Sequence, residues 1–401
     1  MSDDQNINIF GIKVSVENRE TILKKIDSFL ADGHQHYVVT PNPEFLLASR
    51  HDEEFFYILN KSDLSVPDGF GLVLAGLFLG KIIKRYTGAD LTRDILARAS
   101  ERRSRVAVLN WRGGLSSATE IKKSLRELYQ DITIEVFDID RAGKLLDTAA
   151  VNRFAPAILL VSLGAPFQEK IIFHNLAKMP SIKLAIGIGG ALDFLTGKIR
   201  RAPLVMRRLG LEWFWRLVQQ PRRVKRIYRA VLVFSWKLLK WRFVLPFRYR
   251  PNVACLMYKK TTEGYSIFIV ERTEQPGHWQ LPQGGIDHDD PRTAGARELF
   301  EEINCDKFIP RGFFGEVLRY DFDRDAVRYR LQKHAGYRGQ KQSLFIAEFT
   351  GKDNDIKINF WDHSAWRWVD AERLVESLYP RRREHARIHM DKFWSIVGKI
   401  A

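Results

Sequence analysis

Three glutamates near residue 300 have types and spacing that could hold a metal ion. Glu298, Glu301 and Glu302 are spaced i, i+3 and i+4, so on a helix they share one face. Asp290 followed by proline is an N-cap and first-turn pair, which predicts that such a helix begins there. Carboxylates on one face repel unless cations lie among them, and Mg²⁺ or Mn²⁺ prefers such oxygen ligands. A solvated acidic helix face is the alternative, and the glutamates alone favour it.

The residues before these glutamates favour the metal site. The two runs are Trp279-Gln280-Leu281-Pro282-Gln283-Gly284-Gly285 and Arg297-Glu298-Leu299-Phe300-Glu301-Glu302. Together they resemble a Nudix box, and residues 249–253, 339–342 and 366–369 resemble the branch that hydrolyses 5′-triphosphate RNA and dinucleoside polyphosphates. The resemblance implies that the three glutamates bind the metal, that Glu302 is also catalytic, that Gly284 contacts substrate and that Arg297 orients the carboxylates. Asp362 falls where that branch carries a further acid.

Two departures from the Nudix pattern keep an alternative open. The box is one residue short between Gly284 and Arg297, with Asp290 where glutamate is expected, and Asn304 replaces the glycine that ends the helix. Asparagine is the best substitute for glycine in a left-handed C-cap. The short loop affects the expected substrate geometry more than the expected metal binding. A Nudix half that only binds or senses nucleotides is therefore the alternative to an active hydrolase.

Polar or glycine-rich turns follow most apolar runs in the first half of the chain. The runs that read as strands lie at residues 37–40, 105–110, 133–137, 157–162 and 184–188. They alternate with segments of helical period, which predicts a layered α/β sheet. Ligands of such sheets bind outside the carboxyl ends of the strands, where glycines let backbone amides approach a phosphate. The turns that start at Thr40, Asn110, Gly164 and Gly189 are therefore candidate binding elements.

These turns belong to an ordered series of motifs. The series is Thr40-x-Asn42-x-Glu44, Pro67-Asp68-Gly69, Arg85-x-Thr87-Gly88-x-Asp90, Gly164-x-Pro166-x-Gln168-Glu169, Gly187-x-Gly189-Gly190-x-x-Asp193-Phe194, Arg201-Ala202-Pro203 and Glu212-Trp213-x-x-Arg216. It resembles the WecG/TagA/CpsF glycosyltransferases from residue 7 to about residue 230. The resemblance implies inverting transfer of an N-acetylmannosamine-type sugar from a UDP-sugar to an undecaprenyl-diphosphate-linked acceptor. No cofactor is expected in this half.

An inverting transfer needs a carboxylate that accepts the proton of the acceptor hydroxyl. The resemblance gives this role to Asp68, places Thr40 and Asn42 in the donor pocket and places Gln168 beside the reacting sugar. By turn statistics alone, Asp68 would only form a Pro-Asp-Gly turn. Arg85 and Asp90 are expected to bind substrate because they belong to the same series.

Leaving UDP develops charge that amides and guanidinium groups can stabilise. The candidate groups are the amides of Gly189 and Gly190 and the side chains of Arg216, Arg222 and Arg223. Asp138-Ile139-Asp140 imitates the metal-binding acid pair of other glycosyltransferases. Acids at a strand end commonly cap the next helix, so a structural role is favoured for this pair.

Residues 198–250 are strongly basic and aromatic. They contain four Lys and twelve Arg against one acid, Glu212, in a chain whose formal net charge is +16. Cations interleaved with Trp and Phe are typical of a segment that lies on an anionic membrane surface. The most apolar part, residues 230–247, is broken by Lys237, Lys240 and Arg242, so it is not expected to span a bilayer. A solvated basic helix pair or a nucleic-acid patch is the alternative.

The length of 401 residues predicts two or three domains. We expect a Rossmann-like glycosyltransferase domain at residues 1–197, a membrane-surface appendage and linker at 198–248, and a Nudix α/β/α sandwich at 249–401. The two cysteines and the acidic, polar N-terminus favour a reducing cytoplasm over export. The sequence thus predicts a bifunctional enzyme, peripheral on the inner face of the membrane, that also acts on a nucleotide or 5′-triphosphate RNA and could form a homo-oligomer. An RNA-processing Nudix protein with a nucleic-acid-binding basic segment is a further alternative.

Overall fold

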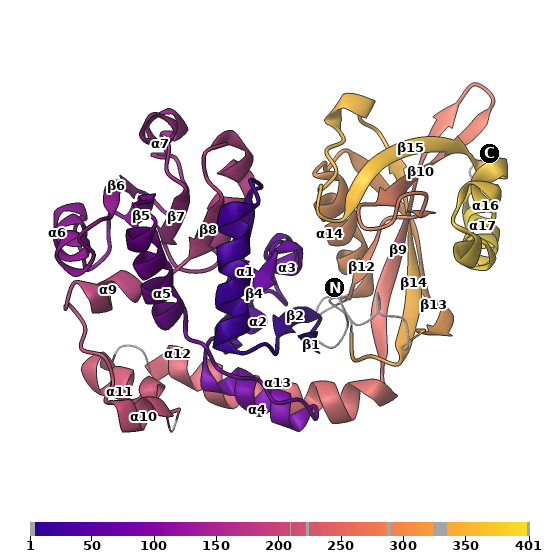
Figure 1. Cartoon of the computed structure of the whole chain (residues 1–401). Coiled ribbons are helices and arrows are strands. Elements are labelled where there is room, and N and C mark those ends of the chain that lie inside the picture. The colour runs from indigo at the N-terminus through magenta and orange to yellow at the C-terminus, as the bar shows by residue number, and fades with distance from the viewer. Residues whose placement is uncertain (1–4, 209, 222–223, 287–289, 324–334, 399–401) are drawn as a thin grey trace. The chain divides into compact units, whose positions relative to one another are not determined.

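The computed structural model describes residues 5–208, 210–221, 224–286, 290–323 and 335–398, and Figure 1 shows the whole chain. The chain divides into two compact units. The first unit runs to Lys240 and the second begins at Trp241. Each described unit contains its own large sheet, as the alternating pattern of the first half and the strand-like runs of the second half predict.

The first unit is built on a parallel sheet. Within the described residues its six strands have the order β4-β3-β8-β7-β5-β6. They are β3 (His36–Val39), β4 (Leu64–Ser65), β5 (Arg105–Trp111), β6 (Thr133–Ile139), β7 (Ile158–Ser162) and β8 (Leu184–Gly187). Most of their side chains are buried, as expected for a parallel sheet covered on both faces. The predicted layered α/β fold is confirmed, and β4 is a short strand that the sequence did not indicate.

Helices connect these strands and cover the sheet (Figure 1). They are α1 (Arg19–Ala31), α2 (Pro43–Ala48), α3 (Glu53–Lys61), α4 (Phe70–Phe78), α5 (Gly88–Glu101), α6 (Ala118–Leu128), α7 (Thr148–Phe154), α8 (Phe167–Asn175) and α9 (Ala191–Leu195). An antiparallel hairpin of β1 (Asn6–Ile9) and β2 (Ile12–Ser15) precedes them. Their buried apolar positions form one core with the strands, which fixes the turns at the carboxyl ends of the strands in place.

The basic stretch forms a series of short helices. They are α10 (Leu204–Arg208), α11 (Glu212–Gln219), α12 (Val224–Tyr228), η4 (Arg229–Val233), α13 (Phe234–Leu239), η5 (Lys240–Val244) and η6 (Leu245–Phe247). Phe234 of α13 is buried and lies edge-on against Phe10, with ring centroids 5.5 Å apart. Where the structure places residues, none of the helices has the length and hydropathy needed to cross a bilayer.

The second unit places helices on both faces of a mixed sheet. Its described strands are β9 (Tyr249–Thr261), β10 (Gly264–Arg272), β11 (Trp279–Gln280), β12 (Gln283–Gly285), β13 (Phe308–Asp321), β14 (Gly339–Phe349) and β15 (His363–Asp370). Alternate residues of β9 enter two cores, one with Phe393 of α17 (Arg383–Val397) and the other with Leu299 of α14 (Pro291–Ile303). This layering matches the predicted Nudix sandwich.

Helix α14 begins and ends as the sequence predicts. The Asp290 side chain accepts hydrogen bonds from the backbone N–H groups of Arg292 and Thr293. At the other end, Asn304 adopts the left-handed conformation with φ of 48°. Both predicted caps are therefore confirmed, and they fix the length of the helix that carries the three glutamates.

Candidate active sites

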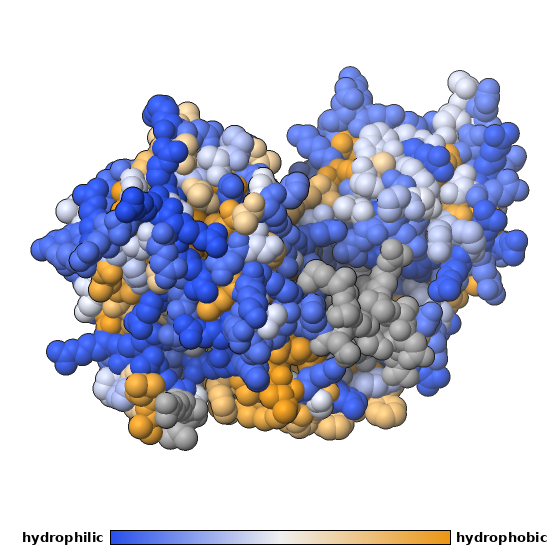
Figure 2. Space-filling model, in the orientation of Figure 1, coloured by the Kyte–Doolittle hydropathy of each residue, from blue (hydrophilic) through white to orange (hydrophobic). Residues whose placement is uncertain are grey.

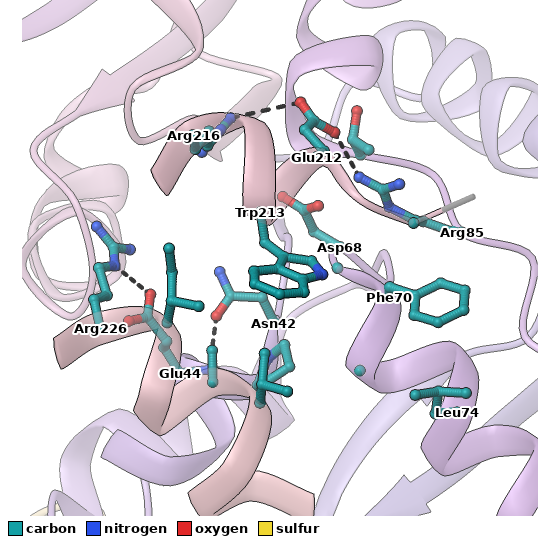
Figure 3. A pocket seen from close by; sticks show the side chains of 18 of the residues that line it. Asn42, Glu44, Asp68, Phe70, Leu74, Arg85, Glu212, Trp213, Arg216 and Arg226 are labelled. Atoms are coloured by element: carbon teal, nitrogen blue, oxygen red, sulfur yellow. Dashed lines mark hydrogen bonds and ion pairs between the residues drawn. The ribbon is translucent and has the colours of Figure 1, made fainter. Parts of the chain in front are cut away.

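A cavity of about 240 Å³ lies at the carboxyl edge of the parallel sheet (Figure 3). Asp68 and Asn42 line it from the turns after β4 and β3, and Trp213 and Arg216 line it from α11. The backbone N–H of Asp68 donates to the Pro41 carbonyl over 2.9 Å, which joins the two turns. Gly69, at φ of 93°, allows the chain to turn directly into α4. The cavity thus has walls from both the sheet edge and the basic stretch.

Asp68 has the environment of a candidate base. Its carboxylate accepts a hydrogen bond from the backbone N–H of Gly88. Burial raises its pKa above the ordinary value, while the guanidinium groups of Arg85 and Arg216 lower it and Glu212 raises it further. A raised pKa increases the basicity of the ionised carboxylate, which suits proton transfer from a hydroxyl group.

Thr40 lies beside Asp68. A Cβ on Gly88 would lie 3.3 Å from Thr40 Oγ1 and 3.4 Å from Asp68 Oδ2, so the two side chains meet at this glycine. Asn42 caps α2, because its Oδ1 accepts from the N–H groups of Glu44 and Phe45 over 2.9 and 3.1 Å. Only its amide nitrogen could therefore serve a ligand in the cavity.

Gln168 connects the turns after β7 and β8. Its Oε1 accepts from the N–H groups of Gly164 and Gly189 over 3.1 and 2.9 Å. Its Nε2 donates to Glu169 Oε1 over 2.6 Å. The amide of Gly189, which the sequence assigned to the diphosphate, is thus engaged by Gln168. Gly190 is the N-cap residue of α9 at the same strand end.

Glu169 is a buried acid to which the sequence gave no role. Burial raises its pKa to about 7, although the hydrogen bond from Gln168 opposes the shift. A Cβ on Gly187 would lie 2.4 Å from Gln168 Nε2 and 2.7 Å from Glu169 Oε1, so this position must remain glycine. Gly187 also accepts a hydrogen bond from Thr40, whose Oγ1 donates to the Gly187 carbonyl over 3.5 Å. Gly187 thus links Glu169 to Thr40 of the candidate site.

A network of charges joins the first half of the unit to the basic stretch. Arg201 Nη1 and Nη2 lie 2.6 and 2.7 Å from the two oxygens of Asp90, and Arg85 lies 2.6 Å from Glu212 Oε2. Arg216 lies 3.8 Å from Glu212 Oε1. Arg85 and Asp90, predicted to bind substrate, therefore hold the basic stretch in the structure.

The remaining candidates of this half differ in their position. Arg222 and Arg223 lie outside the described residues. Asp138 accepts from Asn110 Nδ2 over 2.8 Å, and Asp140 accepts from the Lys144 N–H over 3.2 Å, which supports the favoured structural role of the acid pair. Sequence reasoning overlooked Phe70, Leu74 and Arg226 in the cavity wall, because an apolar helix and one arginine among many carry no local signal of a site.

The three glutamates of α14 lie near one another but have different partners. Arg297 lies 2.8 Å from Glu298 Oε1 and 3.1 Å from Glu301 Oε2. Glu302 is buried, and its Oε2 lies 2.6 Å from His363 Nε2. Among the described residues, no three His, Cys, Asp or Glu side chains lie close enough together to hold a metal ion.

Gly284 makes room for the first of these glutamates. A Cβ there would lie 1.4 Å from Glu298 Oε2, so any larger residue would force the Glu298 side chain to move. Arg297 also donates to the Gly285 carbonyl over 3.2 Å and thus fixes the glycine pair against α14. The sequence named Asp362, but the adjacent His363 makes the contact to Glu302. A histidine at the start of β15 gives no sign of this partner in the sequence.

Comparisons with known proteins agree with both family resemblances. Residues 7–247 match the glycosyl transferase WecG/TagA/CpsF family, and residues 248–391 match the NUDIX domain. The N-acetylglucosaminyldiphosphoundecaprenol N-acetyl-beta-D-mannosaminyltransferase of Bacillus subtilis (strain 168) is 29% identical over 230 residues, which are 53% of this chain and 86% of the relative.

Two further relatives match the second half. The RNA pyrophosphohydrolase of Wolbachia pipientis subsp. Culex pipiens (strain wPip) is 35% identical over 153 residues, covering 37% of this chain and 91% of the relative. That of Gluconacetobacter diazotrophicus is 38% identical over 140 residues, covering 32% and 81%. The two units are therefore a glycosyltransferase and a Nudix hydrolase. The chain belongs to the WecG/TagA/CpsF family and carries a NUDIX domain after it, as the motifs indicated.

Proposed function

We propose that the first unit transfers an N-acetylmannosamine-type sugar from a UDP-sugar to an undecaprenyl-diphosphate-linked acceptor with inversion. The observation that carries the proposal is Asp68, a carboxylate of raised pKa in a cavity between the sheet edge and the basic stretch. The Bacillus relative, whose name specifies such a donor sugar and lipid acceptor, supports the substrate class.

The reaction requires one proton transfer and one nucleophilic substitution at the anomeric carbon. Asp68 accepts the proton of the acceptor hydroxyl as that oxygen bonds to the anomeric carbon, and the bond from this carbon to UDP breaks on the opposite face. The diphosphate leaves with the electron pair of that bond. Arg216, which lines the cavity, is positioned to stabilise the developing charge, and Thr40 lies next to the base.

The basic stretch supports a peripheral position on the inner face of the membrane. Between Glu212 and Glu263 the chain has no acidic residue. Trp213, Phe214 and Trp236 are exposed there, which favours a membrane surface over nucleic acid as the partner.

The Asp68→Asn variant tests the transferase proposal. Asparagine keeps the shape of the side chain and can still accept from Gly88, so folding should be unchanged, while turnover should fall by roughly 10²–10⁴ because the base is lost. The matched control is Asp131→Asn, an exposed aspartate of the same unit. Near-normal sugar transfer by Asp68→Asn would reject the assignment of the base.

We infer that the second unit hydrolyses a diphosphate linkage in a nucleotide or in 5′-triphosphate RNA. Glu298, Glu301 and Glu302 share one helix and supply hard oxygen donors that suit Mg²⁺ or Mn²⁺, and their side chains would have to turn from Arg297 and His363 toward one another to hold the ion. When bound, the metal activates water and stabilises charge on the phosphates. Gly284 keeps Glu298 close to the glycine strand, and His363 positions Glu302.

The Glu302→Gln variant tests the hydrolase proposal. Loss of the charge should weaken metal binding and misplace the attacking water, so Mg²⁺-dependent phosphate release should be abolished. Glu372→Gln, at an exposed position of the same unit, is the control. If the wild type hydrolyses none of a broad panel of nucleotides and 5′-triphosphate RNA, the Nudix half is a nucleotide-binding module instead.

A further inference from the structure

Helix α4 is apolar on its exposed side as well as on its buried side. Its sequence, FGLVLAGLF, contains no polar residue, yet only Leu72, Ala75 and Gly76 are buried. Leu77 is 57% exposed and Ile82, just after the helix, is 73% exposed. A helix at the surface of a soluble unit normally has a polar outer face. We call the exposed residues Leu74, Leu77, Phe78 and Ile82 the α4 face.

The α4 face continues onto the basic stretch. Helices α4 and α13 lie side by side, and a Cβ on Gly71 would lie 3.6 Å from the Phe234 ring (Figure 1). Leu232, Trp236 and Leu239 are exposed on and next to α13. Figure 2 shows the resulting apolar surface along one side of the first unit. Segments about 150 residues apart in the sequence therefore form one apolar surface, and surfaces of this kind mark interaction sites.

The charges around this surface select its partner. No Asp or Glu occurs between Asp68 and Asp90, whereas Lys81 and Lys84 are exposed directly after α4. Lys240 is exposed at the end of α13. Apolar side chains bordered by cations suit an anionic bilayer, because the side chains enter the acyl boundary while the cations contact the headgroups. A second copy of the chain would present the same positive charges, and the two copies would repel each other at this surface.

The α4 face also leads to the candidate base. Phe70 and Leu74 line the cavity that contains Asp68 (Figure 3). Leu77 and Phe78 follow Leu74 within about one turn of the same helix. The cavity of about 240 Å³ is too small for a polyprenyl chain. The acceptor's apolar part must therefore lie outside it.

We propose that α4 and α13 together form a membrane-binding face. The polyprenyl chain of the acceptor stays in the bilayer against this face, while its diphosphate-sugar end enters the Asp68 cavity past Leu74 and Phe70. The membrane contact thus includes a helix of the catalytic fold, about 130 residues before the basic stretch in the sequence. The role of the cavity rests on the proposed transferase function, whereas the membrane contact of α4 stands without it.

The double variant Leu77→Gln/Ile82→Gln tests the face with phosphatidylglycerol vesicles. Both positions are exposed, so the fold should persist, and a sedimentation assay should show binding weakened by about tenfold or more. The matched control is Leu115→Gln/Leu128→Gln, whose leucines are 57% and 55% exposed elsewhere on the first unit and whose binding should equal that of the wild type. Unchanged vesicle binding by the α4 variant would overturn the proposal.

Two acceptors separate this proposal from the transferase function. The α4 variant should lose transfer to a polyprenyl acceptor in vesicles and keep transfer to a soluble acceptor with a short alkyl chain. Loss with both acceptors would mean that α4 only supports the site, and the proposal would fail. If the wild type transfers sugar to neither acceptor but the α4 variant still binds vesicles more weakly than the wild type, the proposed transferase function is wrong and the proposed membrane face is supported. A wild-type dimer that the α4 variant converts to a monomer would show that a second copy covers the face, which also overturns it.

Discussion

Replacing Glu169 with glutamine should remove a pH-dependent cost to the stability of the first unit. Glu169 is 1% exposed, and its Oε2 has no hydrogen-bond partner among the described residues. Its Oε1 accepts from Gln168 Nε2, a bond that the oxygen of glutamine can also accept. The substitution therefore keeps the shape and the known contact of the side chain while it removes the titration.

The magnitude follows from the pKa. Burial raises the pKa of Glu169 from 4.5 to about 7, and each pKa unit corresponds to about 1.4 kcal/mol. Between these values the folded carboxyl is protonated while the unfolded one is ionised, so the folded state binds more protons and the free energy of unfolding falls as pH rises. The full loss is roughly 3 kcal/mol, most of it between pH 5 and pH 8, and it levels off above the folded pKa.

Urea unfolding of the full chain at pH 5 and at pH 8 measures this effect. The wild type should lose stability relative to Glu169→Gln as pH rises. The second unit is identical in both proteins, so its own pH dependence cancels when their free energies of unfolding are compared. Glu101→Gln, at an exposed position of the same unit, should show no such difference. If the difference in free energy of unfolding between wild type and Glu169→Gln were the same at pH 5 and pH 8, the raised pKa of Glu169 would be refuted.

Three further variants test other parts of the structure. Gly284→Ala should abolish hydrolysis by the second unit without affecting sugar transfer, because its Cβ would lie 1.4 Å from Glu298 Oε2, and phosphate release measures it. Arg201→Met removes the ion pair with Asp90 and should lower the stability of the first unit by about 1–2 kcal/mol, a value kept small because solvent screens the partly exposed Asp90. A melting curve measures this loss, with Lys198→Met as the control. A chain that ends after Thr196 keeps α4 but lacks α13 and the basic stretch, so its vesicle binding should be weaker than that of the full chain and its transfer to a lipid-linked acceptor should be lost; sedimentation of this chain equal to that of the full chain would show that the basic stretch makes no membrane contact.

Local sequence patterns predicted most of the fold. The strand runs, the caps at Asp290 and Asn304 and the order of the motifs depend on residues close together in the chain, where turn and capping chemistry acts directly. The short strand β4 was overlooked because two residues show no periodicity.

The partners within the sites could not be predicted in the same way. Asp90 pairs with Arg201, 111 residues later, and Glu302 contacts His363, 61 residues later. Spacing along the chain holds no information about such pairs, which only the packing of distant elements creates.

Parallel assays of the two activities on the same preparations test the central claim most directly. Wild type, Asp68→Asn and Glu302→Gln are each measured for sugar transfer to a lipid-linked acceptor and for Mg²⁺-dependent phosphate release from nucleotides and 5′-triphosphate RNA. We predict that each variant loses one activity and keeps the other, because the two sites lie in separate units and distant changes act independently. Loss of both activities in either variant, or retention of transfer by Asp68→Asn, would contradict the account of two independent enzymes in one chain.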